Sequence, residues 1–314
     1  MVSIFRIITH RLNVLTFNDR SMEMVYDYPL YRPPSEANSM IFQVTLGCSF
    51  NKCSFCNMYR SKEYIERPIS EIVAEINWAS KVYPNTQRVF LADGDALNLE
   101  TDKLIEILSH VKQKFSKIER ISSYAMPKNL VQKTENDLTK LRDYGLDLVY
   151  VGIETGNDKL LKKITKGATA KTIIDSCIKA KKAGLKLSCM VILGIGGKKY
   201  TIEHIRDTAR VVNEASPDYL AALSLILEEG IYDEFMTKYG EPFTSLEDLE
   251  ILDELQRLVE FISPKSPIVF RANHASNVYS IGGTLAEDKS KILSVIKDLK
   301  THPEMLKPKV LRRF

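Results

Sequence analysis

The chain has 314 residues, of which 44% are hydrophobic and 27% charged, and its net charge is +4. This length suits one large globular domain or two small ones. So small a net charge does not argue for nucleic-acid binding, and no apolar run reaches the roughly 18 residues that a membrane-spanning helix needs.

Residues 1–39 precede the first predicted strand and are expected to form an N-terminal lead-in. The segment contains no small-residue cleavage site of the kind that ends a signal peptide. The chain has five cysteines, an odd number, which indicates a reducing compartment rather than a disulfide framework. We therefore expect a cytoplasmic protein.

Short apolar runs alternate with amphipathic segments along the rest of the chain. The predicted strands are 40–47, 88–94, 120–126, 146–154, 186–194, 218–227 and 267–273. The predicted helices include 69–83, 102–115, 170–184, 201–215 and 244–262, the last opening with Thr244 and Glu247 at capping-box spacing. Strands that alternate with helices predict an α/β fold with a parallel sheet. Periodicity alone leaves both a doubly wound sheet and a partial barrel open.

In either fold, chemistry belongs on the loops that follow the strands. Unusual residues fall on these loops: Cys48, Cys53, Cys56, Asp93, Gly94, Asp95, Glu154, Gly194, Gly196, Gly197, Asn273, His274 and Asn277. We therefore expect them to gather at one end of the sheet.

Three of the five cysteines lie within nine residues, as Cys48-x4-Cys53-x2-Cys56. A structural zinc site needs a fourth ligand, and no pair of histidines or cysteines elsewhere has the spacing to supply one. Cys177 and Cys189 fall inside a predicted helix and a predicted strand, and are expected in the core. Three thiolates on one loop suit an iron–sulfur cluster with one iron left open.

The segment CSFNKCSFC at 48–56, with Phe55 between the last two cysteines, resembles the cluster loop of the radical S-adenosylmethionine (radical SAM) superfamily. Three later segments resemble further motifs of that superfamily, in the same order and each after a predicted strand. They are DGDA at 93–96, VGIETG at 151–156 and VILGIGG at 191–197. The loop departs from the commonest pattern in having four residues, rather than three, between the first two cysteines.

The resemblance implies a partial (β/α)6 barrel similar to a TIM barrel, with a radical SAM core at 40–235. Residues 236–314 would form a C-terminal α/β extension that completes the barrel. It also implies that Cys48, Cys53 and Cys56 hold a [4Fe-4S] cluster whose fourth iron binds SAM. An electron from an oxygen-sensitive cluster, supplied by a donor such as flavodoxin or ferredoxin, would cleave SAM to a 5′-deoxyadenosyl radical that abstracts hydrogen from a substrate.

The SAM-binding residues that the resemblance implies are Phe55, Gly94, Asp95, Ser123, Glu154, Gly194 and Gly196. Asp93 is the alternative to Asp95 for the methionyl amino group, and Ser122 accompanies Ser123 near the carboxylate. Glu154 would accept hydrogen bonds from the ribose, or else form an ion pair with a neighbouring lysine.

FRANHASN, residues 270–277, is the best candidate for contacts with a small-molecule or peptide substrate. It offers Arg271, Asn273, His274 and Asn277 at the end of the last predicted strand. The alternative is a loop whose asparagines satisfy its own backbone. Lysine runs at 159–167, 179–186 and 196–200 are either solvated surface or a basic rim for an anionic substrate or an acidic electron carrier.

A second class of function stays open at this point. A carrier or chaperone with a radical SAM fold would bind SAM or haem and deliver it without catalysis. Only His274 offers a haem ligand at the predicted site, and no appended segment supports nucleic-acid modification.

Overall fold

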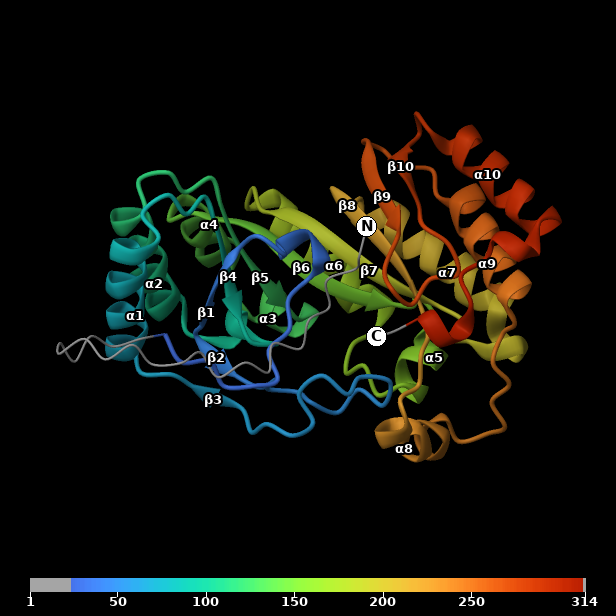
Figure 1. Ribbon diagram of the computed structural model, residues 1–314, viewed down its shortest axis with the longest axis horizontal. Helices are drawn as coiled ribbons and strands as arrows, with labels where there is room; N and C mark the ends of the chain where they lie inside the picture. Colours follow the sequence, from blue (N-terminus) through green and yellow to red (C-terminus); the bar gives the residue numbers. More distant parts are fainter. Residues whose placement is uncertain (1–23, 313–314) are drawn as a thin grey trace.

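The computed structural model describes residues 24–312, so residues 1–23 of the expected lead-in lie outside the described part. Eight strands form one sheet in the order β1-β4-β5-β6-β7-β8-β9-β10 (Figure 1). They are β1 (Met40–Gln43), β4 (Arg88–Ala92), β5 (Arg120–Ala125), β6 (Leu146–Glu154), β7 (Lys186–Leu193), β8 (Tyr219–Ser224), β9 (Ile268–Ala272) and β10 (Ile281–Leu285).

All neighbouring strands of this sheet are parallel except β9 and β10, which are antiparallel. The six strands from β1 to β8 are the predicted partial (β/α)6 barrel, and β9 and β10 extend the sheet beyond it. The α/β prediction is confirmed. The domain boundary predicted between residues 235 and 236 falls inside a helix, Glu229–Tyr239, whose Phe235 is fully buried.

Helices flank the sheet along its length (Figure 1). They are α1 (Ile69–Val82), α2 (Thr101–Lys114), α3 (Pro127–Gln132), α4 (Glu135–Asp143), α5 (Asp158–Lys163), α6 (Ala170–Lys182), α7 (Gly197–Ala215), α8 (Glu229–Tyr239), α9 (Asp248–Phe261) and α10 (Lys289–Thr301). None of the helices in the described part is long and apolar enough to cross a membrane.

The strands divide their side chains between two environments because successive residues point to opposite faces. On β7, Leu187, Cys189 and Val191 pack into the main core, while Met190 faces the inside of the barrel. Leu148 and Tyr150 of β6 likewise face the inside. The outer face therefore binds the helices, and the inner face is left to line a cavity.

Two predicted boundaries are wrong for local reasons. The run 40–47 splits into β1 and a short strand β2 (Thr45–Leu46), which pairs with β3 (Ile65–Glu66). Helix α9 begins at Asp248 rather than near Thr244, with Glu247 and Glu250 as its capping box. Thr244 is used elsewhere, because its carbonyl accepts a hydrogen bond from the Lys198 amide.

Sequence periodicity misses β10 altogether. Its residues, IGGTL, include two glycines, which are depleted in strands because they have no side chain to pack. The strand forms because β9 supplies a full antiparallel ladder, from Ile281 opposite Ala272 to Leu285 opposite Ile268.

One buried carboxylate of the described part of the lead-in, that of Glu36, anchors it to the barrel. Glu36 is fully buried, forms an ion pair with Arg120 at 2.8 Å, and accepts hydrogen bonds from Tyr150 Oη at 2.6 Å and from Ser39. A charge so deeply buried is tolerated only when it is well paired. The ion pair fixes Ser35 and its neighbours as a wall of the cavity.

Candidate functional site

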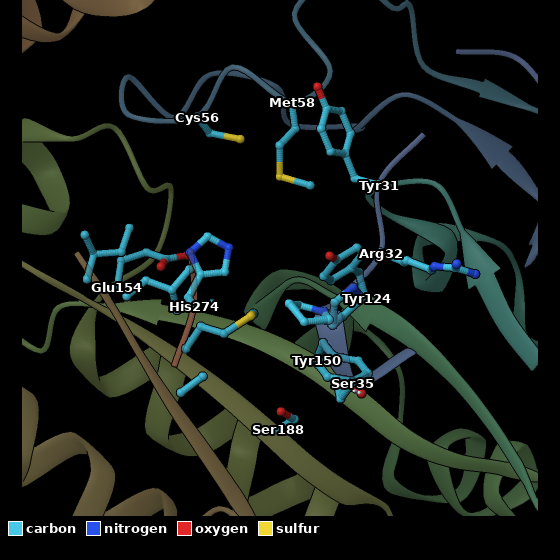
Figure 2. Close-up of a pocket in the computed structure, with 18 of the residues that line it drawn as sticks. Tyr31, Arg32, Ser35, Cys56, Met58, Tyr124, Tyr150, Glu154, Ser188 and His274 are labelled. Carbon is cyan, nitrogen blue, oxygen red and sulfur yellow. Dashed lines mark hydrogen bonds between the residues drawn. The ribbon is translucent and has the colours of Figure 1, made fainter. Parts of the chain in front are cut away.

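A cavity of about 630 Å³ lies between the cysteine loop and the inner face of the sheet. Figure 2 shows Cys56 and Met58 at one end, Tyr150 and Ser188 at the other, and Glu154 and His274 along one side. Its apolar lining includes Phe55, Tyr124, Met190, Ile192, Tyr219 and Leu223. The cavity is large enough for a cofactor together with a small substrate.

Cys48, Cys53 and Cys56 all line this cavity and are partly exposed. Burial raises the pKa of the Cys53 thiol to about 12 and raises the pKa of Cys48 and Cys56 as well. Thiols of this kind become thiolates when a metal replaces the proton. Cys177 and Cys189 are fully buried in the main core, as predicted.

The cysteine loop is held by Arg60, which sequence reasoning missed. The guanidinium of Arg60 donates hydrogen bonds to the carbonyl oxygens of Asn51, Cys53 and Cys56, at 2.9, 2.7 and 3.0 Å. It also forms a 3.2 Å ion pair with Glu234 of α8. One planar group thus binds three points of the loop and fixes the positions of the cysteines relative to one another.

Replacing Arg60 by alanine is expected to lower the iron content of the reconstituted protein several-fold while leaving the fold intact. The loop would lose three charge-assisted hydrogen bonds, each worth about 1.5–3 kcal/mol. Iron and sulfide per chain measure the effect. Arg206→Ala is the matched control, because Arg206 is exposed on α7 and its one ion pair among the described residues is with its neighbour Asp207. Equal iron in both variants would contradict the role given to Arg60.

The loop after β4 contains two aspartates that differ in how many hydrogen bonds their carboxylate oxygens accept. Asp93 is fully buried and accepts hydrogen bonds from Gln43 at 2.9 Å, the Gly47 amide at 3.0 Å and Lys62 at 2.9 Å. Asp93 therefore ties this loop to the cysteine loop, and its oxygens are already occupied.

Asp95 is also fully buried, and burial raises its pKa to about 6. One oxygen of Asp95 accepts a hydrogen bond from Ser49, while its Oδ1 has no partner among the described residues. Asp95 does not line the cavity, whereas its neighbour Gly94 does. Asp95 therefore makes fewer hydrogen bonds than Asp93, and which of the two aspartates contacts the methionyl amino group stays a prediction.

Gly94 has no room for a side chain. A Cβ there would lie 2.6 Å from Cε2 of Tyr59 and 3.3 Å from Cβ of Cys48. Tyr59 lines the cavity, is 3% exposed, and its hydroxyl has no hydrogen-bond partner among the described residues. A buried tyrosine hydroxyl normally finds a partner. Tyr59 is therefore a further site residue that sequence reasoning missed.

At the end of β6, Glu154 forms a 2.7 Å ion pair with Lys166, and each residue is 8% exposed. Both line the cavity. Burial disfavours the charge on Lys166, but Glu154 and Cys53 raise its pKa above the ordinary value, so it stays an ammonium. The ion-pair alternative for Glu154 is thus observed, while contact with a ribose stays a prediction.

The backbone around Glu154 is shaped for this pair. The pairing of β6 with β7 shifts register between Gly152 and Glu154, and Glu154 has a positive φ of 61°. A Cβ at Gly152 would lie 2.0 Å from Oε1 of Glu154 and 2.8 Å from Nζ of Lys166. Gly152, the first glycine of the VGIETG segment, is therefore required, because a side chain there would overlap the ion pair.

The same segment is supported from behind by a buried histidine. Nε2 of His204 lies 3.0 Å from the carbonyl of Ile192, which can only accept, so Nε2 donates and Nδ1 accepts from Thr155 at 2.8 Å. Burial lowers the pKa of His204 to about 4, which keeps this neutral tautomer at neutral pH. His204 thus fixes the loop that follows Glu154.

Several predicted SAM contacts lie outside the cavity lining. The backbone groups of Gly194 and Gly196 form hydrogen bonds within the protein. The Gly194 amide donates to Glu254 at 2.6 Å, and the Gly196 carbonyl accepts from the Tyr239 hydroxyl at 2.9 Å. Ser122 and Ser123 are fully buried and bond to backbone carbonyls. Their contacts with SAM stay predictions.

The FRANHASN segment divides in two. Arg271, Asn273 and His274 line the cavity, whereas Asn277 is buried and bonds to Ser224 and to the carbonyl of Ala222. Asn277 therefore positions the loop and does not face the cavity. Burial lowers the pKa of His274 to about 4, so the imidazole beside the cavity is uncharged at neutral pH.

Lys166 was missed because it lies in a lysine-rich run, and such runs are usually solvated. Its neighbours in that run behave differently: Lys163 pairs with Glu241 at 2.7 Å, and Lys159 donates to Tyr200 at 2.7 Å. No sequence signal separated Lys166 from the other lysines of the run, since its partner Glu154 lies at the end of a different element.

Comparison with known proteins agrees with this geometry. The family model described as the radical SAM superfamily matches residues 42–212, more than half of the chain. The chain belongs to the radical SAM superfamily.

Individual relatives are distant. The chain is 24% identical to the heme chaperone HemW of Buchnera aphidicola, over 56% of this chain and 48% of that protein. It is 23% identical to MJ0865 of Methanocaldococcus jannaschii, provisionally named a methylthiotransferase, over 85% of this chain and 55% of that protein. The chain thus spans about half the length of these curated relatives.

Among solved structures, coproporphyrinogen III oxidase (HemN) of Escherichia coli matches with a TM-score of 0.55 and 16% identity, covering 71% of this chain and 51% of that one. Methylornithine synthase (PylB) matches with a TM-score of 0.51 and 20% identity, covering 73% and 63%. Identities this low show a shared fold only.

The residues present fit the cofactors that the superfamily implies. Three thiols from one loop open into one cavity, and thiolates are the usual ligands of iron–sulfur clusters. Within residues 24–312, no three His, Cys, Asp or Glu side chains meet closely enough to hold a single metal ion. In a cluster each cysteine binds its own iron. Tyr59 lines the same cavity, and its hydroxyl, which has no hydrogen-bond partner among the described residues, has capacity for a polar ligand.

Proposed function

We propose that this protein is a radical SAM enzyme. It binds a [4Fe-4S] cluster through Cys48, Cys53 and Cys56, and cleaves SAM reductively to a 5′-deoxyadenosyl radical that abstracts hydrogen from a substrate in the cavity. The observation that carries the proposal is the opening of all three thiols into one apolar cavity next to the buried Glu154–Lys166 pair.

When bound, the cluster supplies the single electron that breaks the C–S bond of SAM. The side chains of this chain do the rest. Phe55 and Ile192 exclude water from the space beside the cysteines. Lys166 places a positive charge near Cys53, which favours the thiolate. Glu154 offers the cavity a carboxylate that a ribose hydroxyl can donate to. Contact of Asp95 with the methionyl ammonium group stays a prediction.

An external one-electron donor completes the proposal. Flavodoxin or ferredoxin is the class of partner that fits, because the cysteine loop also presents an exposed lysine, Lys52, directly before Cys53.

The test is formation of 5′-deoxyadenosine after anaerobic reconstitution of the full chain with iron and sulfide. SAM and dithionite are added, and the nucleoside is quantified by chromatography. We expect nucleoside only when reconstituted protein and dithionite are both present, because cleavage requires a reduced cluster. The same preparation without dithionite, and protein never given iron, are the controls. A fully loaded protein that binds SAM but never cleaves it would contradict the enzymatic proposal.

That negative outcome would favour the second candidate, a haem or SAM carrier with a radical SAM fold. Its support is the similarity to HemW and the position of His274 on the cavity wall (Figure 2). Titration with haem tests it directly. A saturable Soret shift that is lost in His274→Ala would support the carrier, and the absence of such a shift would remove it.

A further inference from the structure

Within the described part of the chain, four cationic side chains line the main cavity, and two of them pair with carboxylates. Arg120 pairs with Glu36, and Lys166 pairs with Glu154. Arg32 donates to the carbonyl of Ser39 at 2.7 Å, and in Figure 2 its guanidinium points away from the centre of the cavity. Arg271 is the fourth.

Arg271 lacks a carboxylate partner within the described part of the chain. Its Nη1 donates to the carbonyl of Phe270 at 2.8 Å, which leaves Nε and Nη2 available. A guanidinium presents five donors in a planar fork that suits carboxylates and phosphates. Arg271 therefore has unused capacity for an anion.

The residues on either side of Arg271 leave it uncovered. On the neighbouring strands Ala221 of β8 and Gly282 of β10 lie opposite it, and neither has a side chain long enough to cover a guanidinium. A Cβ at Gly282 would lie 3.1 Å from Cδ of Arg271 and 3.4 Å from its Nη1. Gly282 is one of the two glycines that made β10 unrecognisable from sequence periodicity. Because it has no side chain, it leaves space beside Arg271.

Arg271 also lies between two hollows. Together with Asn273 it lines both the main cavity and a second hollow of about 380 Å³. The rest of the second hollow is formed by β10 and the residue before it: Ser280, Ile281, Gly282 and Gly283. No acidic residue lines the second hollow. The main cavity next to it is lined by apolar and aromatic groups, including Val269 and Tyr219.

We propose that the edge formed by β9 and β10 binds the anionic group of the substrate, a carboxylate or a phosphate. Arg271 is its direct ligand, and Asn273 and Ser280 supply further hydrogen bonds. The substrate is therefore an amphipathic anion, whose apolar body lies in the main cavity against Tyr219, Met190 and Tyr150. This inference rests on the proposed function for the identity of the ligand as a substrate, but the anion site is tested separately.

The test uses three probes that share one apolar body: 4-phenylbutyrate, 4-phenylbutyl phosphate and the uncharged 4-phenylbutyramide. Calorimetric titrations are made under anaerobic conditions with the reconstituted full chain. We expect at least one anion to bind roughly tenfold or more tightly than the amide, because hydrogen bonds to charged groups are the stronger ones. Whether the carboxylate or the phosphate binds more tightly then identifies the anion.

Arg271→Gln is expected to weaken binding of the preferred anion roughly tenfold or more and to leave the amide unchanged. Arg271→Lys keeps the charge without the fork and should fall between the two proteins. Arg88→Gln is the matched control, since Arg88 is exposed at the first position of β4 and lies outside the cavity lining. Equal affinity for amide and anions, no binding of any probe, or unchanged affinity in Arg271→Gln would each overturn the proposal.

Formation of 5′-deoxyadenosine is measured on the same preparations. Binding of anions without SAM cleavage would reject the enzymatic proposal and keep the anion site. SAM cleavage with no preference for anions would keep the enzymatic proposal and reject the anion site.

Discussion

Replacing Cys53 by alanine is expected to leave the reconstituted protein with little or no cluster and with no SAM cleavage above background. The three cysteines of the loop are the partly exposed ones, and the remaining two are fully buried in the core, so no other thiol can take the vacated position. Iron and sulfide content and the electron paramagnetic resonance signal of the reduced protein measure the loss.

Cys177→Ala is the matched control, because it also removes one thiol but does so from α6, within the main core. It is expected to keep the wild-type iron content and to lose about 1 kcal/mol of unfolding free energy, as typical core substitutions do. If Cys53→Ala kept the iron of the wild type, or if Cys177→Ala lost it to the same extent, the assignment of the cluster loop would be wrong.

Lys166→Met should lower the free energy of unfolding by about 3–5 kcal/mol, because it leaves the carboxylate of Glu154 buried without its partner. Binding of SAM should weaken as well, since the Glu154 side chain would no longer be fixed across Gly152. Urea denaturation measures the first effect, and equilibrium dialysis of SAM measures the second. Lys171→Met is the control, because Lys171 is 82% exposed and its pairing with Asp175 is worth little.

The double variant Glu154→Gln, Lys166→Met separates the two roles of the pair. Removing both charges should restore most of the lost stability, since no unpaired charge remains buried. We expect the affinity for SAM to stay low, because an amide cannot replace a carboxylate as a strong acceptor. Recovery of SAM binding together with stability would show that Glu154 is structural and not a SAM ligand.

The alternation of strands and helices, the parallel sheet and the cysteine loop could all be predicted from the sequence, because each rests on a local pattern, whereas the order of the strands in the sheet could not. Hydrophobic periodicity reports which residues must be buried, and the Cys48-x4-Cys53-x2-Cys56 spacing is contained within one loop. Strand β10 was not predicted, because it forms through pairing with β9 and not through its own composition.

The sequence alone therefore determined that this is an α/β protein with three closely spaced thiols at one end of a parallel sheet. Only the tertiary structure decided which neighbouring polar residues serve that site. Asp93 and Asp95 differ by two positions, yet one is fully bonded and the other keeps an open oxygen. Lys166 is buried against Glu154, while Asn277 faces away from the cavity. Such assignments depend on hydrogen-bond partners that are distant in the chain, and those partners meet only once the sheet has formed.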